Sequence, residues 1–215
     1  MRILAIDAAG AACSVAILTE GRVTAARVAE SSRGAASSLP GMVAGALAAS
    51  PGALDGVAAS VGPGSFTGLR AALSLAHGLA LGFGVDLIGV SVAEALAESV
   101  GDLNGRMLWV ALDSRRGRVF LDRGGVLTAV ALDALPTPSG PIAVAGDAAI
   151  PVAARLAARG CNVLLTSVRQ PLAAGVGHAA LRRRRGELPP LPAVPLYVDA
   201  PEARLPACGL RPAPV

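Results

Sequence analysis

Short apolar runs separated by turns open the chain and predict a β-meander. The runs Ile3 to Ile6, Cys13 to Leu18 and Arg22 to Val28 are divided by an Asp-Ala-Ala-Gly segment and a Glu-Gly turn. Apolar residues then recur at helical spacing from Leu39 to Leu47, after two serines that can cap a helix. The pattern continues with a strand over 57–61, a helix over 66–82, a strand over 87–90 and a short helix over 92–100. The first hundred residues therefore predict the order β-β-β-α-β-α-β-α.

An internal echo suggests a second, related half. Met1 to Asp7 and Met107 to Asp113 share one pattern, which is Met, two variable positions, an aliphatic residue, Ala, an aliphatic residue and Asp. A turn and a returning strand, Arg118 to Leu121, follow the second copy. Two readings stay open, a duplication and two ordinary hairpins.

The rest of the second half predicts shorter elements and then an extended tail. Strands are expected near 126–132, 142–145 and 163–165, with helices near 152–159 and 172–185. Eight prolines after Gly186 exclude regular interior structure. We expect a first lobe over residues 1–100 and a second, smaller lobe over 101–215 that ends in the proline-rich tail.

Composition narrows the class of protein. With 53% hydrophobic residues and a net charge of only +4, the chain is not a disordered polymer. All nineteen basic residues are arginine, which excludes a phosphate loop or Schiff base that depends on lysine. Cys13, Cys161 and Cys208 are widely spaced, as expected in a reducing compartment. Without an export signal or a membrane span, we expect a cytoplasmic protein with no membrane contact.

A glycine-rich loop precedes the long helix and has two interpretations. Gly62, Gly64, Ser65 and Thr67 could present free backbone N–H groups to an anion at the positive end of the helix. Alternatively, Ser65 caps the helix and the glycines supply a tight turn.

The long helix carries two apolar stripes, so it needs cover on two sides. One side would be its own sheet, and the other either a neighbouring helix of this chain or a second protein. The candidate partner interface comprises Leu39, Met42, Val43, Leu47, Leu69, Leu73, Leu75 and Leu79.

Residues for catalysis are few. His77 and His178 lack a second histidine at zinc-binding spacing, and no nucleophile elbow occurs. Asp7, at a strand end, is the candidate for a catalytic or metal-binding role in an enzyme. The run Arg182, Arg183, Arg184 and Arg185 either complements a helix C-terminus or contacts RNA phosphates. We predict no catalytic residue, cofactor or metal in this chain.

Several ordered motifs resemble one family. They are Met-Arg-Ile-Leu-Ala-Ile-Asp at the start, Ala-Cys-Ser-Val-Ala from Ala12, Gly-Pro-Gly-Ser-Phe-Thr-Gly-Leu-Arg from Gly62, Gly-Leu-Ala-Leu-Gly from Gly78, Ile-Gly-Val-Ser from Ile88, Ala-Leu-Asp-Ser-Arg-Arg-Gly from Ala111, and Pro-Leu-Tyr from Pro195. Together they are similar to the TsaB (YeaZ) family over about 120 residues.

The resemblance implies an α/β fold of the duplicated actin-like ATPase class (ASKHA, ribonuclease H-like), with two lobes that each hold a mixed sheet and flanking helices. It implies a non-catalytic subunit that pairs with the transferase TsaD, or with a second copy of itself, through first-lobe helices. With the ATPase TsaE, that complex forms N6-threonylcarbamoyladenosine at position 37 of tRNAs reading ANN codons, so tRNA is an indirect partner. The alternative is an enzyme, either a glycoprotease-type peptidase or a residual ATPase.

Three positions depart from the family pattern. Gly34 stands in a segment where the family commonly has Lys-His-Ser, Arg118 where a glutamate is common, and Asp199 where an arginine is common. These changes concern polar details of the surface and leave the expected fold unchanged.

Overall fold

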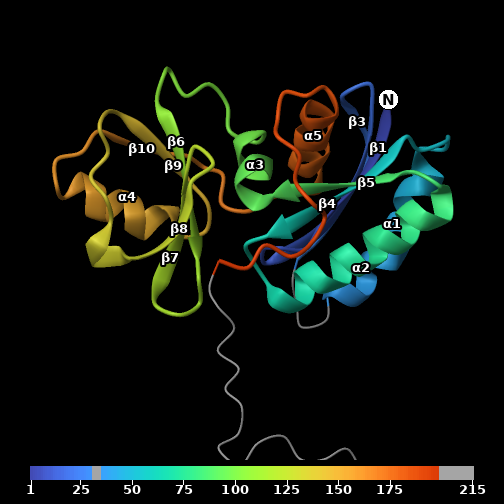
Figure 1. Ribbon diagram of the computed structural model, residues 1–215, viewed down its shortest axis with the longest axis horizontal. Helices are drawn as coiled ribbons and strands as arrows, with labels where there is room; N and C mark the ends of the chain where they lie inside the picture. Colours follow the sequence, from blue (N-terminus) through green and yellow to red (C-terminus); the bar gives the residue numbers. More distant parts are fainter. Residues whose placement is uncertain (31–34, 199–215) are drawn as a thin grey trace, which may run out of the picture.

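The computed structural model describes residues 1–30 and 35–198, which form two lobes built on two five-stranded mixed sheets (Figure 1). The first sheet contains β1 (Arg2–Asp7), β2 (Ala12–Thr19), β3 (Arg22–Glu30), β4 (Gly56–Gly62) and β5 (Asp86–Ser91), in the order β3-β2-β1-β4-β5. The second contains β6 (Met107–Asp113), β7 (Arg118–Arg123), β8 (Leu127–Ala131), β9 (Ile142–Ala145) and β10 (Val163–Leu165), in the order β8-β7-β6-β9-β10.

The two sheets have the same topology. In the first, β1 is antiparallel to β2 and parallel to β4, and in the second β6 is antiparallel to β7 and parallel to β9. The strands that carry the sequence echo, β1 and β6, occupy the same central place. The echo therefore reflects a duplication, and the α/β duplicated actin-like fold expected from the resemblance is confirmed.

Helices pack on both faces of the first sheet. They are η1 (Ala35–Ser38), α1 (Leu39–Ala49), α2 (Phe66–Phe83), α3 (Val92–Ala97), η2 (Leu132–Ala134), α4 (Ala149–Ala157) and α5 (Ala173–Arg184). Helices α1 and α2 cover one face of the first sheet, and α5 with α3 covers the other. In β1, Leu4 and Ile6 therefore face α1 and α2, whereas Ile3 and Ala5 face α5, as the two-residue period of a strand requires.

Helix α5 follows the second sheet in the sequence but packs on the first (Figure 1). Two glycines permit this close approach. A Cβ at Gly175 would lie 2.2 Å from the Ala95 carbonyl oxygen, and one at Gly177 would lie 2.2 Å from Leu18 Cδ1. The chain thus returns to the first lobe after completing the second, and a division at residue 100 stays a prediction.

The segment that follows α5 also lies on the first lobe. Residues 187–198 contain no helix or strand, as the prolines predicted. The Leu196 N–H donates to the Val61 carbonyl oxygen at 2.8 Å, and Leu191, Ala193 and Leu196 pack against the core beneath α1 and α2. We call residues 187–198 the strap. The positions noted above at Gly34, Asp199 and Cys208 lie outside the described residues.

Other sequence predictions agree with the structure to within a few residues. The helix expected over 152–159 begins earlier, at Ala149, and the strand expected over 126–132 is β8. Within the described residues, no helix is both long and apolar enough to cross a membrane. The cytoplasmic location stays a prediction.

Candidate functional site

The glycine-rich loop connects β4 to α2 and is shaped by backbone contacts. Ser65 caps α2, because its hydroxyl accepts a hydrogen bond from the Gly68 N–H at 3.2 Å. Gly62 has a φ of 110°, and a Cβ at Gly64 would lie 2.4 Å from the Ala9 carbonyl oxygen. These contacts explain Gly62, Gly64 and Ser65 without an anion, while Thr67 is exposed to solvent. Anion binding at this loop stays a prediction.

Asp7 lies at the end of β1, beneath this loop, and its side chain is fully buried. The Ala9 N–H donates to Asp7 Oδ1 at 3.3 Å, and Oδ2 has no hydrogen-bond partner. Burial raises the pKa of Asp7 to about 7, against the lowering effects of the nearby Ser60 hydroxyl and of the Ala9 N–H. In this conformation the carboxyl group cannot touch a substrate or a metal ion.

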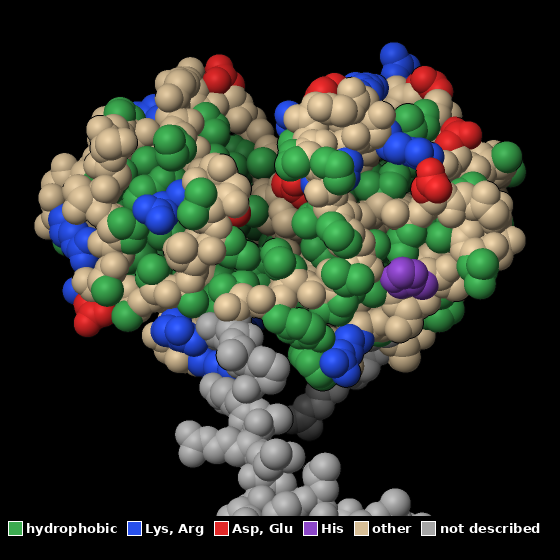
Figure 2. All heavy atoms as spheres, viewed as in Figure 1, with side chains coloured by type: hydrophobic (Ala, Val, Ile, Leu, Met, Phe, Trp, Pro, Cys, Tyr) green, Lys and Arg blue, Asp and Glu red, His purple; other side chains and the backbone are tan. Residues whose placement is uncertain are grey.

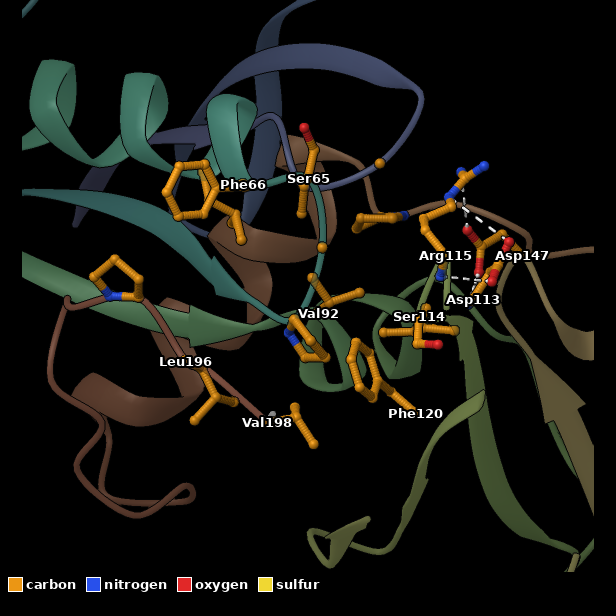
Figure 3. Close-up of a pocket in the computed structure, with 18 of the residues that line it drawn as sticks. Ser65, Phe66, Val92, Asp113, Ser114, Arg115, Phe120, Asp147, Leu196 and Val198 are labelled. Atoms are coloured by element: carbon orange, nitrogen blue, oxygen red, sulfur yellow. Dashed lines mark hydrogen bonds and ion pairs between the residues drawn. The ribbon is translucent and has the colours of Figure 1, made fainter. Parts of the chain in front are cut away.

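A cavity of about 620 Å³ lies between the two lobes. Its walls come from separate stretches of the chain, among them the start of α2, the β6–β7 turn, the loop before α5 and the end of the strap. In Figure 3, Ser65 and Phe66 lie on one side, Phe120 and Val198 on another, and Arg115 at one end. We call this cavity the interlobe cleft. Figure 2 shows a notch between the two lobes at the upper edge of the molecule, which is not this cleft, because the start of α2 that lines the cleft lies toward the lower edge (Figure 1).

Charged groups of the second lobe gather at one end of the cleft. The Arg115 guanidinium lies 3.7 Å from an Asp113 oxygen and 3.8 Å from an Asp147 oxygen (Figure 3). The Asp113 N–H donates to Asp147 Oδ1 at 2.8 Å. Burial is the main cause of the raised pKa of Asp147, and the negative charge of Asp113 adds to it. Within the described chain, no three His, Cys, Asp or Glu residues lie close enough together to hold a metal ion.

The predicted interface on α1 and α2 divides into two groups. Leu39, Val43, Leu69 and Leu73 are buried in the interior of the lobes, so they cannot contact a partner in this conformation. Met42, Leu47, Leu75 and Leu79 are only partly buried, at the edge of the core formed with the first sheet. The sequence pattern identified apolar residues correctly but did not separate core from surface. Only the second group stays a candidate for partner contact.

The most exposed apolar residues of α2 are not among the residues predicted for the interface. Leu81 is 86% exposed, and Phe66 and Phe83 lie near its two ends with about half of their surface accessible. Phe66 and Leu81 belong to a stripe with Arg70, Ser74 and His77, whose spacing places all five on one helix face, away from the buried one. That spacing was the available signal.

Three glycines leave backbone exposed on these two helices. A Cβ at Gly41 of α1, or at Gly78 or Gly82 of α2, would meet no other atom within 4 Å. The backbone at these positions is open to solvent rather than to the other helix. We call the surface formed by these glycines and by Met42, Leu47, Leu75, Leu79 and Leu81 the outer helical face.

The arginines at the end of α5 are held by carboxylates of the first lobe. Arg182 pairs with Glu98 at 2.7 Å and with Glu187 at 3.0 Å, and Arg184 pairs with Asp86 at 2.8 Å. Arg183 pairs with Glu94 and is largely buried, while Arg185 approaches Glu187 only to 3.9 Å. This pattern anchors α5 to the first lobe. It does not present four cations to tRNA, and the predicted tRNA contact has no support from this arrangement.

Comparisons with known proteins identify relatives of this chain. Residues 29–158 match the family model described as TsaD, tRNA N6-adenosine threonylcarbamoyltransferase. The tRNA threonylcarbamoyladenosine biosynthesis protein TsaB of Escherichia coli is 42% identical over 125 residues, 56% of this chain and 53% of that protein. An uncharacterized protein of Mycobacterium bovis is 33% identical over 159 residues, 70% of this chain and 67% of that protein.

Solved structures agree with these sequence relationships. The structure titled YeaZ from Pseudomonas aeruginosa has a TM-score of 0.75 and 27% identity, and the match covers 91% of this chain and 99% of that one. In sequence, the chain spans about half the length of the curated TsaB relatives that it matches. The matching sequence motifs, the shared architecture and the family model together show that this chain belongs to the TsaB/YeaZ family.

Proposed function

We propose that this chain is a non-catalytic assembly subunit for tRNA threonylcarbamoyladenosine synthesis, and that it binds the transferase TsaD through the outer helical face. The pathway follows from the TsaB relatives. The TsaD description of the matching family model supports the choice of partner. Within the complex, the ATPase TsaE would act through the transferase, and a second copy of this chain is the competing occupant of the same face.

One observation carries this proposal, which is the apolar surface left open along α2. Leu81 is 86% exposed, and the partly buried Leu75 and Leu79 belong to the same helix. Open glycine backbone at Gly78 and Gly82 would let a partner helix approach closely. Exposed apolar surface of this kind marks protein-protein contacts in soluble proteins.

The burial of Asp7 supports a non-catalytic role over the enzyme alternative. A residual ATPase or a metal-dependent peptidase would need a carboxylate that reaches its substrate or metal. The Asp7 side chain is 0% exposed. Activity of the isolated chain that is lost in Asp7→Asn, with the fold intact, would favour the enzyme instead.

A charge placed on the outer helical face tests the proposal. Leu81→Glu should abolish co-purification with the transferase and lower tRNA modification in a reconstituted reaction, because burying an unpaired carboxylate is costly. Ile150→Glu is the matched control, because Ile150 is an exposed aliphatic residue on α4 of the second lobe.

The outcomes separate the alternatives. Normal co-purification of Leu81→Glu would reject the outer helical face as the transferase interface, and unimpaired modification without this chain would reject the assembly role. Light scattering of the purified chain distinguishes the two occupants. If Leu81→Glu converts a homodimer to a monomer yet leaves the transferase bound, the face joins two copies of this chain.

A further inference from the structure

Aromatic residues are rare in this chain, yet most of them meet in one place. The sequence has five, and three of these, Phe66, Phe120 and Tyr197, line the interlobe cleft. Trp109 is buried in the second lobe, and Phe83 lies at the far end of α2. Packing in the core of the second lobe explains the presence of Trp109. It does not explain Phe66 and Tyr197, which remain 58% and 56% exposed.

The exposed rings are held in position by an arginine. The Arg70 guanidinium carbon lies 4.0 Å from the centre of the Phe66 ring, and an Arg70 nitrogen donates to the Tyr197 hydroxyl at 3.3 Å. The two rings are 6.5 Å apart and tilted by 37°. The backbone of the strap is itself fixed by the Leu196 N–H. We call Phe66, Arg70 and Tyr197 the aromatic platform, and its faces are ordered before any ligand arrives.

The charge around the cleft favours an anion. Its lining includes four arginines, Arg70, Arg115, Arg116 and Arg169, against two aspartates, Asp113 and Asp147. Arg115 is the arginine at the open end, with its side chain 76% exposed and its contacts to the two aspartates longer than 3.5 Å. A flat aromatic surface beside an excess of guanidinium groups suits a ligand that combines a planar ring with a phosphate.

We propose that the interlobe cleft and the aromatic platform bind an unpaired nucleotide of an RNA strand, with its base on the platform and its phosphates near Arg115. The shared chemistry, a base and a phosphate, is also that of a free nucleotide. The choice of RNA rests on the proposed function in tRNA modification. This assignment places the RNA contact at the start of α2, near Phe66. It does not place the contact at the arginines of α5, which are paired with carboxylates.

Nucleic acid explains the platform better than a protein partner does. Base stacking uses both an accessible ring face and a nearby cation, and single-stranded binding proteins combine them along a concave groove. The cleft is concave and has aromatic residues on more than one wall (Figure 3). The outer helical face, by contrast, offers aliphatic residues and open glycine backbone.

Fluorescence anisotropy of the full chain with a labelled RNA stem–loop tests the stacking contact. Phe66→Ala should weaken binding about tenfold, as loss of one stacking ring does. Tyr197→Phe keeps its ring but loses the hydrogen bond from Arg70, so it should weaken binding less than Phe66→Ala does. Phe83→Ala is the matched control, because this exposed ring lies about 25 Å along α2 from Phe66 and outside the cleft.

Salt dependence tests the phosphate contact. Arg115→Gln should reduce the slope of log affinity against log salt by about 0.7, the value for one lost phosphate contact on a single strand. Arg155→Gln removes the same charge from exposed α4, outside the cleft, and should leave the slope unchanged. Equal slopes for both variants would overturn the assignment of Arg115.

Three further results would overturn the proposal. The first is unchanged affinity of Phe66→Ala, and the second is equal binding of a fully paired RNA duplex, which offers no free base. The third is displacement of the stem–loop by adenosine monophosphate at equal concentration, which would make the cleft a small-molecule site. Phe66→Ala should still co-purify with the transferase, whereas Leu81→Glu should still bind RNA, so failure of this proposal and failure of the assembly role are distinguishable.

Discussion

Asp7 and Asp113 end equivalent strands of the two sheets and make the same local hydrogen bond in opposite surroundings. Each carboxylate accepts a bond from the N–H group two residues ahead, from Ala9 at 3.3 Å and from Arg115 at 2.8 Å. Asp7 is fully buried, whereas Asp113 is exposed in the interlobe cleft beside Arg115. The two halves thus share this local hydrogen bond, but the carboxyl group is buried in the first half and exposed in the second.

This difference predicts that Asp7 makes the stability of the fold depend on pH. Burial raises the pKa of Asp7 in the folded state to about 7, from an unfolded value near 3.8. Between these values the folded chain holds a proton that the unfolded chain has lost, so the contribution of Asp7 to stability falls as pH rises. The penalty is absent below about pH 4 and reaches roughly 4 kcal/mol above about pH 7.

Asp7→Asn should therefore stabilise the fold at pH 8 by up to about 4 kcal/mol relative to the original chain and have little effect at pH 4. Urea denaturation at several pH values measures this difference. Asp133→Asn, at an exposed carboxylate on η2, supplies the control and should show no such trend. A difference between Asp7→Asn and the original chain that stays constant with pH would contradict the assignment.

A second prediction concerns the anchor of α5. Arg183 is 8% exposed and donates to the Gly89 and Pro189 carbonyl oxygens, each at 2.6 Å, as well as to Glu94. Arg183→Gln should cost about 3 kcal/mol of unfolding free energy, because it leaves a largely buried carboxylate and two carbonyls without their donor.

Arg185→Gln is its counterpart at a solvent-exposed position. The side chain of Arg185 is 60% exposed and its ion pair is loose, so the change should stay within about 0.5 kcal/mol. Thermal and urea denaturation of both variants measure these values. Equal effects would show that Arg183 does not anchor the helix.

A third prediction is that two similar glycine substitutions change the stability of the fold in opposite directions. Helix propensity alone favours alanine at both Gly175 and Gly78 by about 1 kcal/mol. At Gly175 the added Cβ would lie 2.2 Å from the Ala95 carbonyl oxygen, so Gly175→Ala should destabilise the fold by roughly 1–3 kcal/mol as α5 moves away from α3. At Gly78 the space is open, and Gly78→Ala should be stabilising.

Calorimetry of the two variants gives the sign directly. An increase in melting temperature for Gly175→Ala would show that α5 does not need its close approach to α3.

Local features of the fold were predictable because they depend on neighbouring residues. The apolar run of β1, the apolar spacing of α2 and the Ser65 cap are all determined within a few positions of the chain. The duplication was also visible, because β1 and β6 keep one pattern at the end of equivalent strands.

Features that join distant segments were not predictable. The apolar residues of α5 indicate a buried helix but do not specify which sheet it covers. The arginine run looked like a nucleic-acid patch because its carboxylate partners, such as Glu94 and Asp86, lie some ninety residues earlier. The interlobe cleft was not predicted for the same reason, since its walls come from several distant stretches that only the folded chain brings together.

The position of α5 also constrains how the protein is made. The strands of the first sheet lie within the first ninety-one residues, but the helix that covers one of its faces begins only at Ala173. During translation, apolar residues such as Ile3 and Ile88 therefore stay without this cover until residues 173–184 have left the ribosome. A nascent chain stopped after the first sheet would expose an apolar face that is prone to aggregation, and we expect chaperones to bind it.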